Sequence, residues 1–315
     1  MKKNIITLIG LLGINMMFSA SVKAEDDWFT FYGKIHVAYD KLDFTGSDED
    51  WEFNSYASRL GFKGKGAISD NLEAFYHLEW QVDVTFESDD KVKDRNQVVG
   101  LRGNFGEVLA GRHDTPTKSA QNKIDLFSDM PGDLKYSFNG EVRAAEMVQY
   151  TTPIMGDFLI KAAVVVDDEK TDDNGFSTYA AYKKDGLILG LSYDSDIEKE
   201  NLETIRLISQ YKINDWQLGF IFQQTDYNSD RGDGFVVSAK YNFGDYNLKM
   251  QYFDSNIWNM GISSKIKYSS QYTLGIDRKV VKNFNVYGYM SEGTRGATSI
   301  DDTVVGVGFV YKFKF

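Results

Sequence analysis

The chain has 315 residues, of which 15% are aromatic, and it carries a formal charge of -11 at pH 7. The aromatic content excludes a disordered chain, because so many large rings offset the entropy that is lost on folding. The lack of cysteine excludes disulfide frameworks, thiolate catalysis and cysteine-ligated metal sites, and the acidic balance argues against nucleic acid as a partner.

Residues 1–24 have the pattern of a secretory signal peptide. Two lysines precede an apolar run from Ile5 to Phe18, and small residues follow up to Ala24. The run is too short for a transmembrane helix, which needs about 20 apolar residues. We therefore predict cleavage after Ala24 and a single mature domain over residues 25–315. Cleavage removes three of the 35 basic side chains and none of the 46 acidic ones, so the net charge becomes -14.

Apolar and polar residues alternate with a period of two through the mature chain. Near its start, Phe29, Phe31, Ile35, Val37 and Tyr39 alternate with mostly polar neighbours. This alternation is typical of β-strands with one apolar face. It predicts sixteen strands, at residues 28–40, 55–66, 72–84, 95–104, 106–113, 142–151, 157–166, 176–183, 187–194, 204–213, 216–225, 234–243, 246–253, 267–278, 284–292 and 303–315.

The links between these strands alternate in length. Short links, such as 184–186 and 244–245, contain turn-forming residues. The long links are polar and acidic, at 42–54, 85–94, 167–174, 195–203 and 226–233. This asymmetry is typical of outer-membrane barrels, which have short periplasmic turns and longer external loops. The predicted fold class is therefore all-β, a transmembrane antiparallel up-and-down barrel.

The size of the barrel decides which face points inward. Sixteen strands enclose an aqueous lumen, so the polar face should line it and the apolar face should meet lipid. Arg95 and Arg102 fall on opposite faces of one predicted strand, however, and Glu146 shares an otherwise apolar face with Ala144 and Val148. A charge facing lipid is costly. We interpret the small residues in this part of the chain as a surface that another subunit covers.

Several segments resemble those of a known family, the trimeric general diffusion porins of Gram-negative outer membranes. They are FYGKIHVAYD at 31–40, SYASRLGFKGKGAISDNLEAFYHLEW at 55–80, VVGLRGNFGEVLAGRHDTP at 98–116, SSQYTLGIDRKVVKNFNVYGYMS at 269–291 and GVGFVYKFKF at 306–315. The resemblance implies an outer-membrane channel that forms a homotrimer and contacts membrane lipid and lipopolysaccharide. It also implies that the barrel assembly machinery recognises the terminal Phe315.

The resemblance further implies that the connection 114–140 folds into the lumen, where its acidic groups face a ladder of basic side chains on the wall. The matching acidic positions are Asp125, Asp129 and Asp133. The matching basic positions are Lys34, Arg59, Arg95 and Arg143. Lys34 and Arg59 also lie on the polar faces of their predicted strands. Facing cations and anions across a narrow aqueous gap favour polar solutes over apolar ones.

The predicted function is passive diffusion of small hydrophilic solutes and ions, with no cofactor and no reaction. The net charge of the mature chain predicts a modest preference for cations. One alternative is a solute-specific porin, which should show an aromatic row or a strong basic cluster along one lumen wall. Another is an adhesin or phage receptor that acts through external loops, in keeping with Arg231-Gly232-Asp233 in the long link 226–233.

Enzymatic and metal chemistry find little support in the sequence. The three histidines are His36, His77 and His113, and Glu79 lies two residues beyond His77, but no nucleophile motif accompanies them. The acidic run 167–175 fails as an EF-hand, because Lys170 stands where an oxygen ligand is required. We interpret these features as lumen histidines and a solvated loop. Loose binding of divalent ions to that loop stays open.

Overall fold

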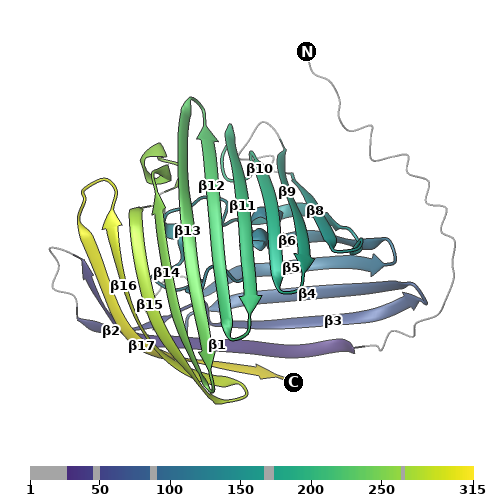
Figure 1. Cartoon of the computed structure of the whole chain (residues 1–315). Helices are drawn as coiled ribbons and strands as arrows, with labels where there is room; N and C mark the ends of the chain where they lie inside the picture. The colour runs from purple at the N-terminus through teal and green to yellow at the C-terminus, as the bar shows by residue number, and fades with distance from the viewer. Residues whose placement is uncertain (1–26, 45–49, 86–90, 167–173, 264–266) are drawn as a thin grey trace.

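The computed structural model describes residues 27–44, 50–85, 91–166, 174–263 and 267–315, and the predicted signal peptide and residues 167–173 lie outside them. The described residues form one antiparallel sheet that closes into a barrel (Figure 1). In this part of the chain no helix has the length and hydropathy to cross a membrane. The strands are β1 (Asp27–Phe44), β2 (Trp51–Ser55), β3 (Arg59–Ser69), β4 (Leu72–Val82), β5 (Val92–Gly103), β6 (Gly106–Asp114), β7 (Arg143–Thr151), β8 (Phe158–Val165), β9 (Gly175–Lys184), β10 (Leu187–Ser195), β11 (Leu202–Ile213), β12 (Trp216–Tyr227), β13 (Asp230–Phe243), β14 (Tyr246–Ser255), β15 (Tyr268–Val281), β16 (Phe284–Arg295) and β17 (Asp301–Lys314).

The barrel closes through β1, which pairs with β17 on one side and with β3 on the other. Val37 on β1 lies opposite Phe309, and Lys34 lies opposite Arg59 on the second side. The predicted sixteen-stranded barrel is confirmed, with β2 as an additional short strand that pairs with β1. Residues 51–54 were expected in the long link 42–54, and residue 55 at the start of the next strand. They extend the sheet because the first strand runs on to Phe44 and offers them free backbone groups.

Side chains alternate between two faces along each strand, as β11 shows. Thr204, Arg206 and Gln210 are buried on the inner face, whereas Ile205 and Leu207 are 44% and 49% exposed on the outer face. In a barrel that crosses a membrane, such an outer apolar face is solvated by lipid. The apolar residues therefore stabilise the fold from outside, and polar residues line the inside.

A β-bulge on β5 removes one conflict in the alternation. Arg95 and Asn96 together lie opposite the single residue Glu79 of β4. The extra residue shifts the alternation by one position. Arg95 and Arg102 consequently reach the same face of β4, where they pair with Glu79 at 2.7 Å and with Glu73 at 2.8 Å. The expectation that the two arginines lie on opposite faces is wrong.

A second bulge, on β7, corrects the expectation for Glu146. Ala145 and Glu146 together lie opposite Arg112 of β6, and Glu146 has a left-handed backbone with φ of 51°. Ala144 is buried on the inner face, whereas Val148 is 52% exposed on the outer face. Glu146 therefore does not lie on one continuous apolar face with both of these residues. Period-two counting fails here because a bulge adds a residue without a partner.

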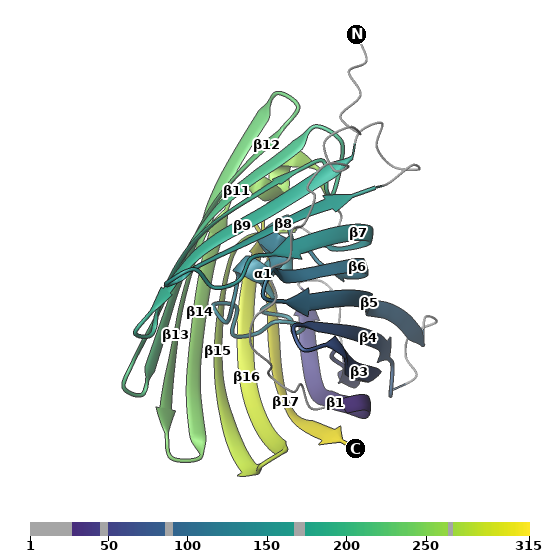
Figure 2. The same ribbon diagram turned by 90° about the vertical axis from the view of Figure 1, so that its right-hand side faces the viewer.

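The connection between β6 and β7 packs on the inner side of the barrel. It contains α1 (Pro116–Ala120) and η2 (Leu134–Tyr136), and a further short helix, η3 (Ile257–Met260), follows β14. Ile124 and Phe138 of the connection pack against inner residues such as Ile221 and Phe253. In Figure 2, α1 lies between the strands of the two sides of the barrel. This inward segment, residues 115–142, places polar groups opposite the wall formed by β1 and β3–β7.

Candidate functional site

One carboxylate of the inward segment lies within reach of three cations on the barrel wall. Asp129 Oδ2 is 3.2 Å from Arg59 Nη2 and 3.4 Å from Lys34 Nζ, and Asp129 Oδ1 is 3.9 Å from Arg95 Nη1. The cations come from β1, β3 and β5, three strands that are well separated in the sequence. The structure therefore brings together Asp129 and three of the four predicted basic residues.

The positive wall keeps Asp129 ionised. Burial alone would raise the pKa of this carboxyl, but the charges of Lys34, Arg59 and Arg95 outweigh burial and lower the pKa to about 2. The backbone of Asp129 is left-handed, with φ of 71°. Its amide donates to the carboxylate of Asp133 at 2.7 Å, which supports this turn. The negative charge is thus present throughout the physiological pH range.

Glu79 on β4 is a second carboxylate at the same place. It accepts from Arg95 Nε at 2.7 Å, from Arg59 Nη1 at 3.4 Å and from the Tyr32 hydroxyl at 2.9 Å. From the sequence, Glu79 was expected only as a partner of His77. Its place on the polar face of the strand after the one that carries Arg59 could have indicated a contact with the wall cations. Its pairing with Arg95, however, depends on the β5 bulge.

The other predicted acidic residues serve the inward segment itself. Asp133 accepts from the amide of Lys135 at 2.9 Å and pairs with its ammonium group at 3.0 Å. Asp125 is buried and accepts from the amides of Phe127 and Leu134. Burial and the nearby charge of Asp133 raise the pKa of Asp125 well above its usual value. Among the described residues, neither carboxylate forms an ion pair with the four predicted cations.

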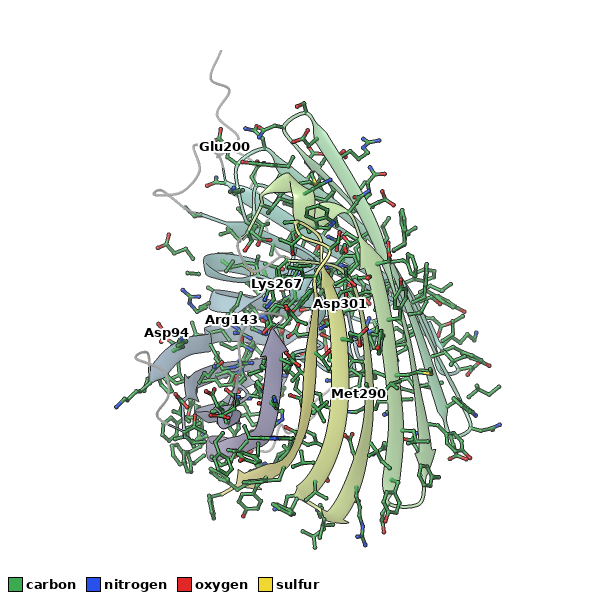
Figure 3. All side chains as sticks on the ribbon, turned by 90° about the vertical axis from the view of Figure 1, so that its left-hand side faces the viewer. Asp94, Arg143, Glu200, Lys267, Met290 and Asp301 are labelled. Carbon is green, nitrogen blue, oxygen red and sulfur yellow. The ribbon has the colours of Figure 1, made fainter. Side chains whose placement is uncertain are left out.

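Arg143, the fourth predicted cation, has a different partner. Its Nη2 lies 2.9 Å from Asp114 at the end of β6, and its Nε donates to Asn96 at 2.7 Å. Lys118 of α1 lies 3.5 Å from the same Asp114 carboxylate. Arg143 (labelled in Figure 3) is therefore part of a neighbouring charge cluster, and Asp114 is a site residue that the sequence analysis missed.

A fully buried arginine holds both ends of the inward segment. Arg206 on β11 donates to the carbonyl oxygens of Thr117 at 3.3 Å and Asn139 at 3.0 Å. It also pairs with the carboxylate of Glu141 at 2.7 Å. Burial raises the pKa of Glu141 to about 7, although the charge of Arg206 opposes this. Arg206 had a polar position on a predicted strand, but no local pattern indicated its partners.

A polar cavity of about 930 Å³ lies between the inward segment and the wall that carries these cations. Among the described residues that line it, eight are Lys or Arg and six are Asp or Glu. The lining includes Arg59, Arg95 and Arg143 from the wall and Asp129 from the segment. The cavity is therefore an aqueous, charged space with an excess of cationic side chains.

The features that were weighed as catalytic or adhesive have other contacts. The rings of His36 and His77 contact the hydroxyls of Tyr287 and Tyr32, and His113 contacts a backbone carbonyl. The link 226–233, expected as a long external loop, is a two-residue turn between β12 and β13. Its Arg-Gly-Asp tripeptide consequently lies in a strand, where Arg231 pairs with Asp226.

No group of three or more metal-ligating side chains is found in the described ranges.

The sequence matches the Gram-negative porin family over residues 12–314. The chain belongs to this family. It is 27% identical over 329 residues to outer membrane porin protein 32 of Delftia acidovorans, a match covering 92% of this chain and 89% of that protein. It is 23% identical over 285 residues to major outer membrane protein P.IB of Neisseria meningitidis serogroup B, covering 81% and 83%.

Solved structures have the same fold as this porin. The anion-selective porin from Comamonas acidovorans superposes with a TM-score of 0.77 at 22% identity, covering 92% of this chain and all of that one. Salmonella typhi OmpF, in complex with daunomycin, gives 0.74 at 17% identity, covering 91% and 98%. This porin is thus a β-barrel of the Gram-negative outer membrane and a diffusion channel rather than an enzyme.

Proposed function

We propose that this porin is a passive channel for small hydrophilic solutes and ions, narrowed by the segment 114–140. The observation that carries the proposal is the contact of Asp129 with Lys34, Arg59 and Arg95. The side chains of Lys34, Arg59 and Asp129 are only 15%, 21% and 25% exposed, so water and salt screen their charges weakly. The resulting field across the gap orients water and favours polar solutes.

We further propose that the channel prefers anions, although the net charge of the mature chain favours cations. Solutes respond to the charges at the narrowest place more than to the charges of distant loops. Of the acidic residues at the cavity, Asp133 pairs with one of the eight cations, Lys135. Burial raises the pKa of Asp125 well above its usual value, and Glu141 pairs with Arg206, which is not among the eight cations. The excess of positive over negative charge at the cavity is therefore larger than the count of eight cationic and six acidic side chains indicates. The similar porin from Comamonas acidovorans is anion-selective.

The substitution Asp129→Asn tests both proposals. It removes one of the few solvent-accessible negative charges at the proposed constriction, so the ratio of chloride to potassium permeability should rise about two-fold or more. The measurement is the reversal potential of the channel in a planar bilayer under a KCl gradient. A wild-type channel that prefers cations would overturn the selectivity proposal, and an unchanged ratio in the variant would overturn the position of the constriction.

A matched control is available in Asp254→Asn, which removes the same charge from the outward-pointing parity of β14. Asp254 faces the outside of the barrel, whereas the constriction cations face the inside. Its neighbours Phe253 and Ser255 are buried on the inner face, so the alternation places Asp254 on the outer one. This variant should leave the permeability ratio unchanged. An equal effect of both substitutions would mean that total charge, rather than the constriction, sets the selectivity.

A solute-specific porin is the second candidate, favoured by one observation. Lys93, Arg95, Arg112 and Arg143 line the same side of the cavity, as a basic cluster for an anionic solute should. A preferred organic anion would interrupt the ion current at low concentration, whereas a general diffusion channel would show no such block.

We also propose a homotrimer, with Phe315 as the recognition signal for the barrel assembly machinery. The outer faces of β5–β7 carry the rather small exposed residues Val99, Val108 and Val148. OmpT of Vibrio cholerae, a structural neighbour with a TM-score of 0.66, is described in a trimer form. Phe315 is 81% exposed at the end of the barrel, where a partner can reach it.

A further inference from the structure

The lipid-facing wall of β12–β17, with the adjoining residues of β1 and β2, contains two apolar hollows that meet. Each has a volume of about 550 Å³, and Ile276 and Gly288 line both of them. Ala239 and Gly288 form the low points, because the neighbouring outer residues are large. The surrounding large residues are Trp216, Leu248, Met250, Leu274 and Met290. We call this surface the outer groove, and Figure 3 faces its wall, with Met290 labelled.

The shape of the outer groove depends on Gly288. This residue lies between Tyr287 and Tyr289, which are buried on the inside, so its missing side chain would point outward. A Cβ built there meets nothing closer than 3.8 Å. Gly288 therefore leaves space for a ligand, and it is not required by tight packing.

An outward-facing cation, Arg278, lies at one end of the outer groove. Arg278 on β15 has the same parity as the exposed residues Leu274 and Ile276, and it lines one of the hollows. Its guanidinium lies 5.5 Å from the centre of the Tyr246 ring, and among the described residues no carboxylate lies within 4.0 Å of it. A cation beside hydrocarbon is costly unless an anion or water solvates it. A guanidinium binds phosphate with two parallel hydrogen bonds.

The position of Arg278 fits the headgroup region of one leaflet. It lies opposite Tyr246, next to the short turn at residues 244–245, and short turns are periplasmic in this class of barrel. Trp216, Tyr241 and Phe243 form a chain of ring contacts that continues to Tyr246, as an interfacial girdle does. The four residue steps from Arg278 to Leu274 span about 13 Å along the tilted strand, or about 10 Å of depth, which lies within one leaflet of about 15 Å.

We propose that the outer groove binds one glycerophospholipid of the inner leaflet, with its phosphate at Arg278 and its acyl chains over Ala239 and Gly288. One chain lies in each hollow, and the phosphate provides the counter-charge that Arg278 lacks within the described chain. The lipid is held by charge at one end and by shape along its length, which distinguishes it from lipid that merely surrounds the barrel.

The test uses the mature barrel in detergent, with phosphatidylglycerol added, and native mass spectrometry to measure lipid retained per subunit. The wild type should retain one lipid. Arg278→Gln removes the charge, and Gly288→Leu fills the groove, so each should weaken retention about tenfold or more. Lys312→Gln is the matched control. It removes a cation near the same end of the barrel, but Lys312 shares the strand parity of the buried Val304 and therefore lies on the inner face, away from the groove.

Equal retention by all four proteins would overturn the proposal, and so would a loss in Lys312→Gln as large as that in Arg278→Gln. Stronger retention of lipopolysaccharide than of phosphatidylglycerol would overturn the choice of the inner leaflet. Gly288→Leu should fold, since its side chain points into open space. Unchanged conductance of the variants would show that the channel is intact and that only lipid binding has changed.

Discussion

At the scale of residues, two carboxylates determine how the wall cations are held. Glu79 lies on the wall itself and binds Arg95 and Arg59, whereas Asp129 approaches the same cations from the inward segment. The side chain of Glu79 is only 6% exposed, against 25% for Asp129. Glu79 therefore mainly orients the arginines, and Asp129 is the more exposed of the two negative charges, the one that we propose a passing solute meets.

The substitution Glu79→Gln should affect both selectivity and stability. It leaves Arg95 without its nearest counter-charge, so we expect a destabilisation of about 1–3 kcal/mol and a further shift towards anions. Thermal unfolding of the folded barrel and the reversal potential in a KCl gradient measure the two effects. Unchanged thermal stability would show that Arg95 is satisfied by its other neighbours, Gln81 and Asp129.

At the scale of elements, the inward segment is held by polar contacts from many strands. Arg206 on β11 binds both of its ends, and Gln251 on β14 binds its middle through the amide of Leu126 and the carbonyl of Gly132. Buried polar groups must find partners, and here the segment and the wall provide them for each other. The contacts fix the segment at the place where Asp129 meets the cations.

The buried Glu141 should make the stability of the porin depend on pH. Its pKa is raised to about 7 in the folded state, above its ordinary value of 4.5. The folded state therefore binds this proton more tightly, so the contribution of Glu141 favours folding at low pH and is lost as pH rises through about 7. We expect a higher unfolding temperature at pH 5 than at pH 8, and Glu141→Gln should reduce this difference.

The unfolding temperature of both proteins, measured between pH 5 and pH 8, checks this expectation. Asp129 provides a contrast, because its pKa of about 2 keeps it ionised over the whole range. Its substitution should not alter the pH profile. A profile that is the same with and without Glu141 would show that other groups cause the dependence.

At the scale of the whole molecule, the barrel has two different outer walls. The wall of β12–β17 carries large apolar and aromatic residues and the outer groove. The wall of β5–β7 carries smaller ones, such as Val99 and Val148, which are 61% and 52% exposed. Small residues let two backbones approach closely, whereas large ones suit contact with fluid lipid.

The proposed trimer can be tested by a matched pair of substitutions. Val148→Trp on β7 should separate the subunits, because the larger side chain prevents close packing. Val237→Trp on β13, at a residue that is 41% exposed on the lipid-facing wall, should leave the trimer intact. Crosslinking followed by gel electrophoresis shows the subunit number. If the wild type gives only monomers, the trimer proposal fails.

Much of the fold could be predicted from the sequence because it depends on a local pattern. The alternation in β11 places Thr204 and Arg206 inside and Ile205 outside, and neighbouring residues alone are enough to show this. The number of strands and the barrel class follow from the same signal. The β5 and β7 bulges could not be predicted, because an extra residue becomes visible only when the partner strand is placed beside it.

The candidate site, like the fold, could be predicted from the sequence only in part. Lys34, Arg59, Arg95 and Asp129 were identified from local motifs that resemble a family, and the three cations do approach Asp129. The sequence by itself determined the strand pattern, the lipid-facing residues and the supply of charges. The tertiary structure alone decided which charges meet, since Asp129 reaches Lys34 across 95 residues of chain. It also turned Asp125 and Asp133 towards backbone amides, because hydrogen bonding within a folded segment depends on its path and not on its composition.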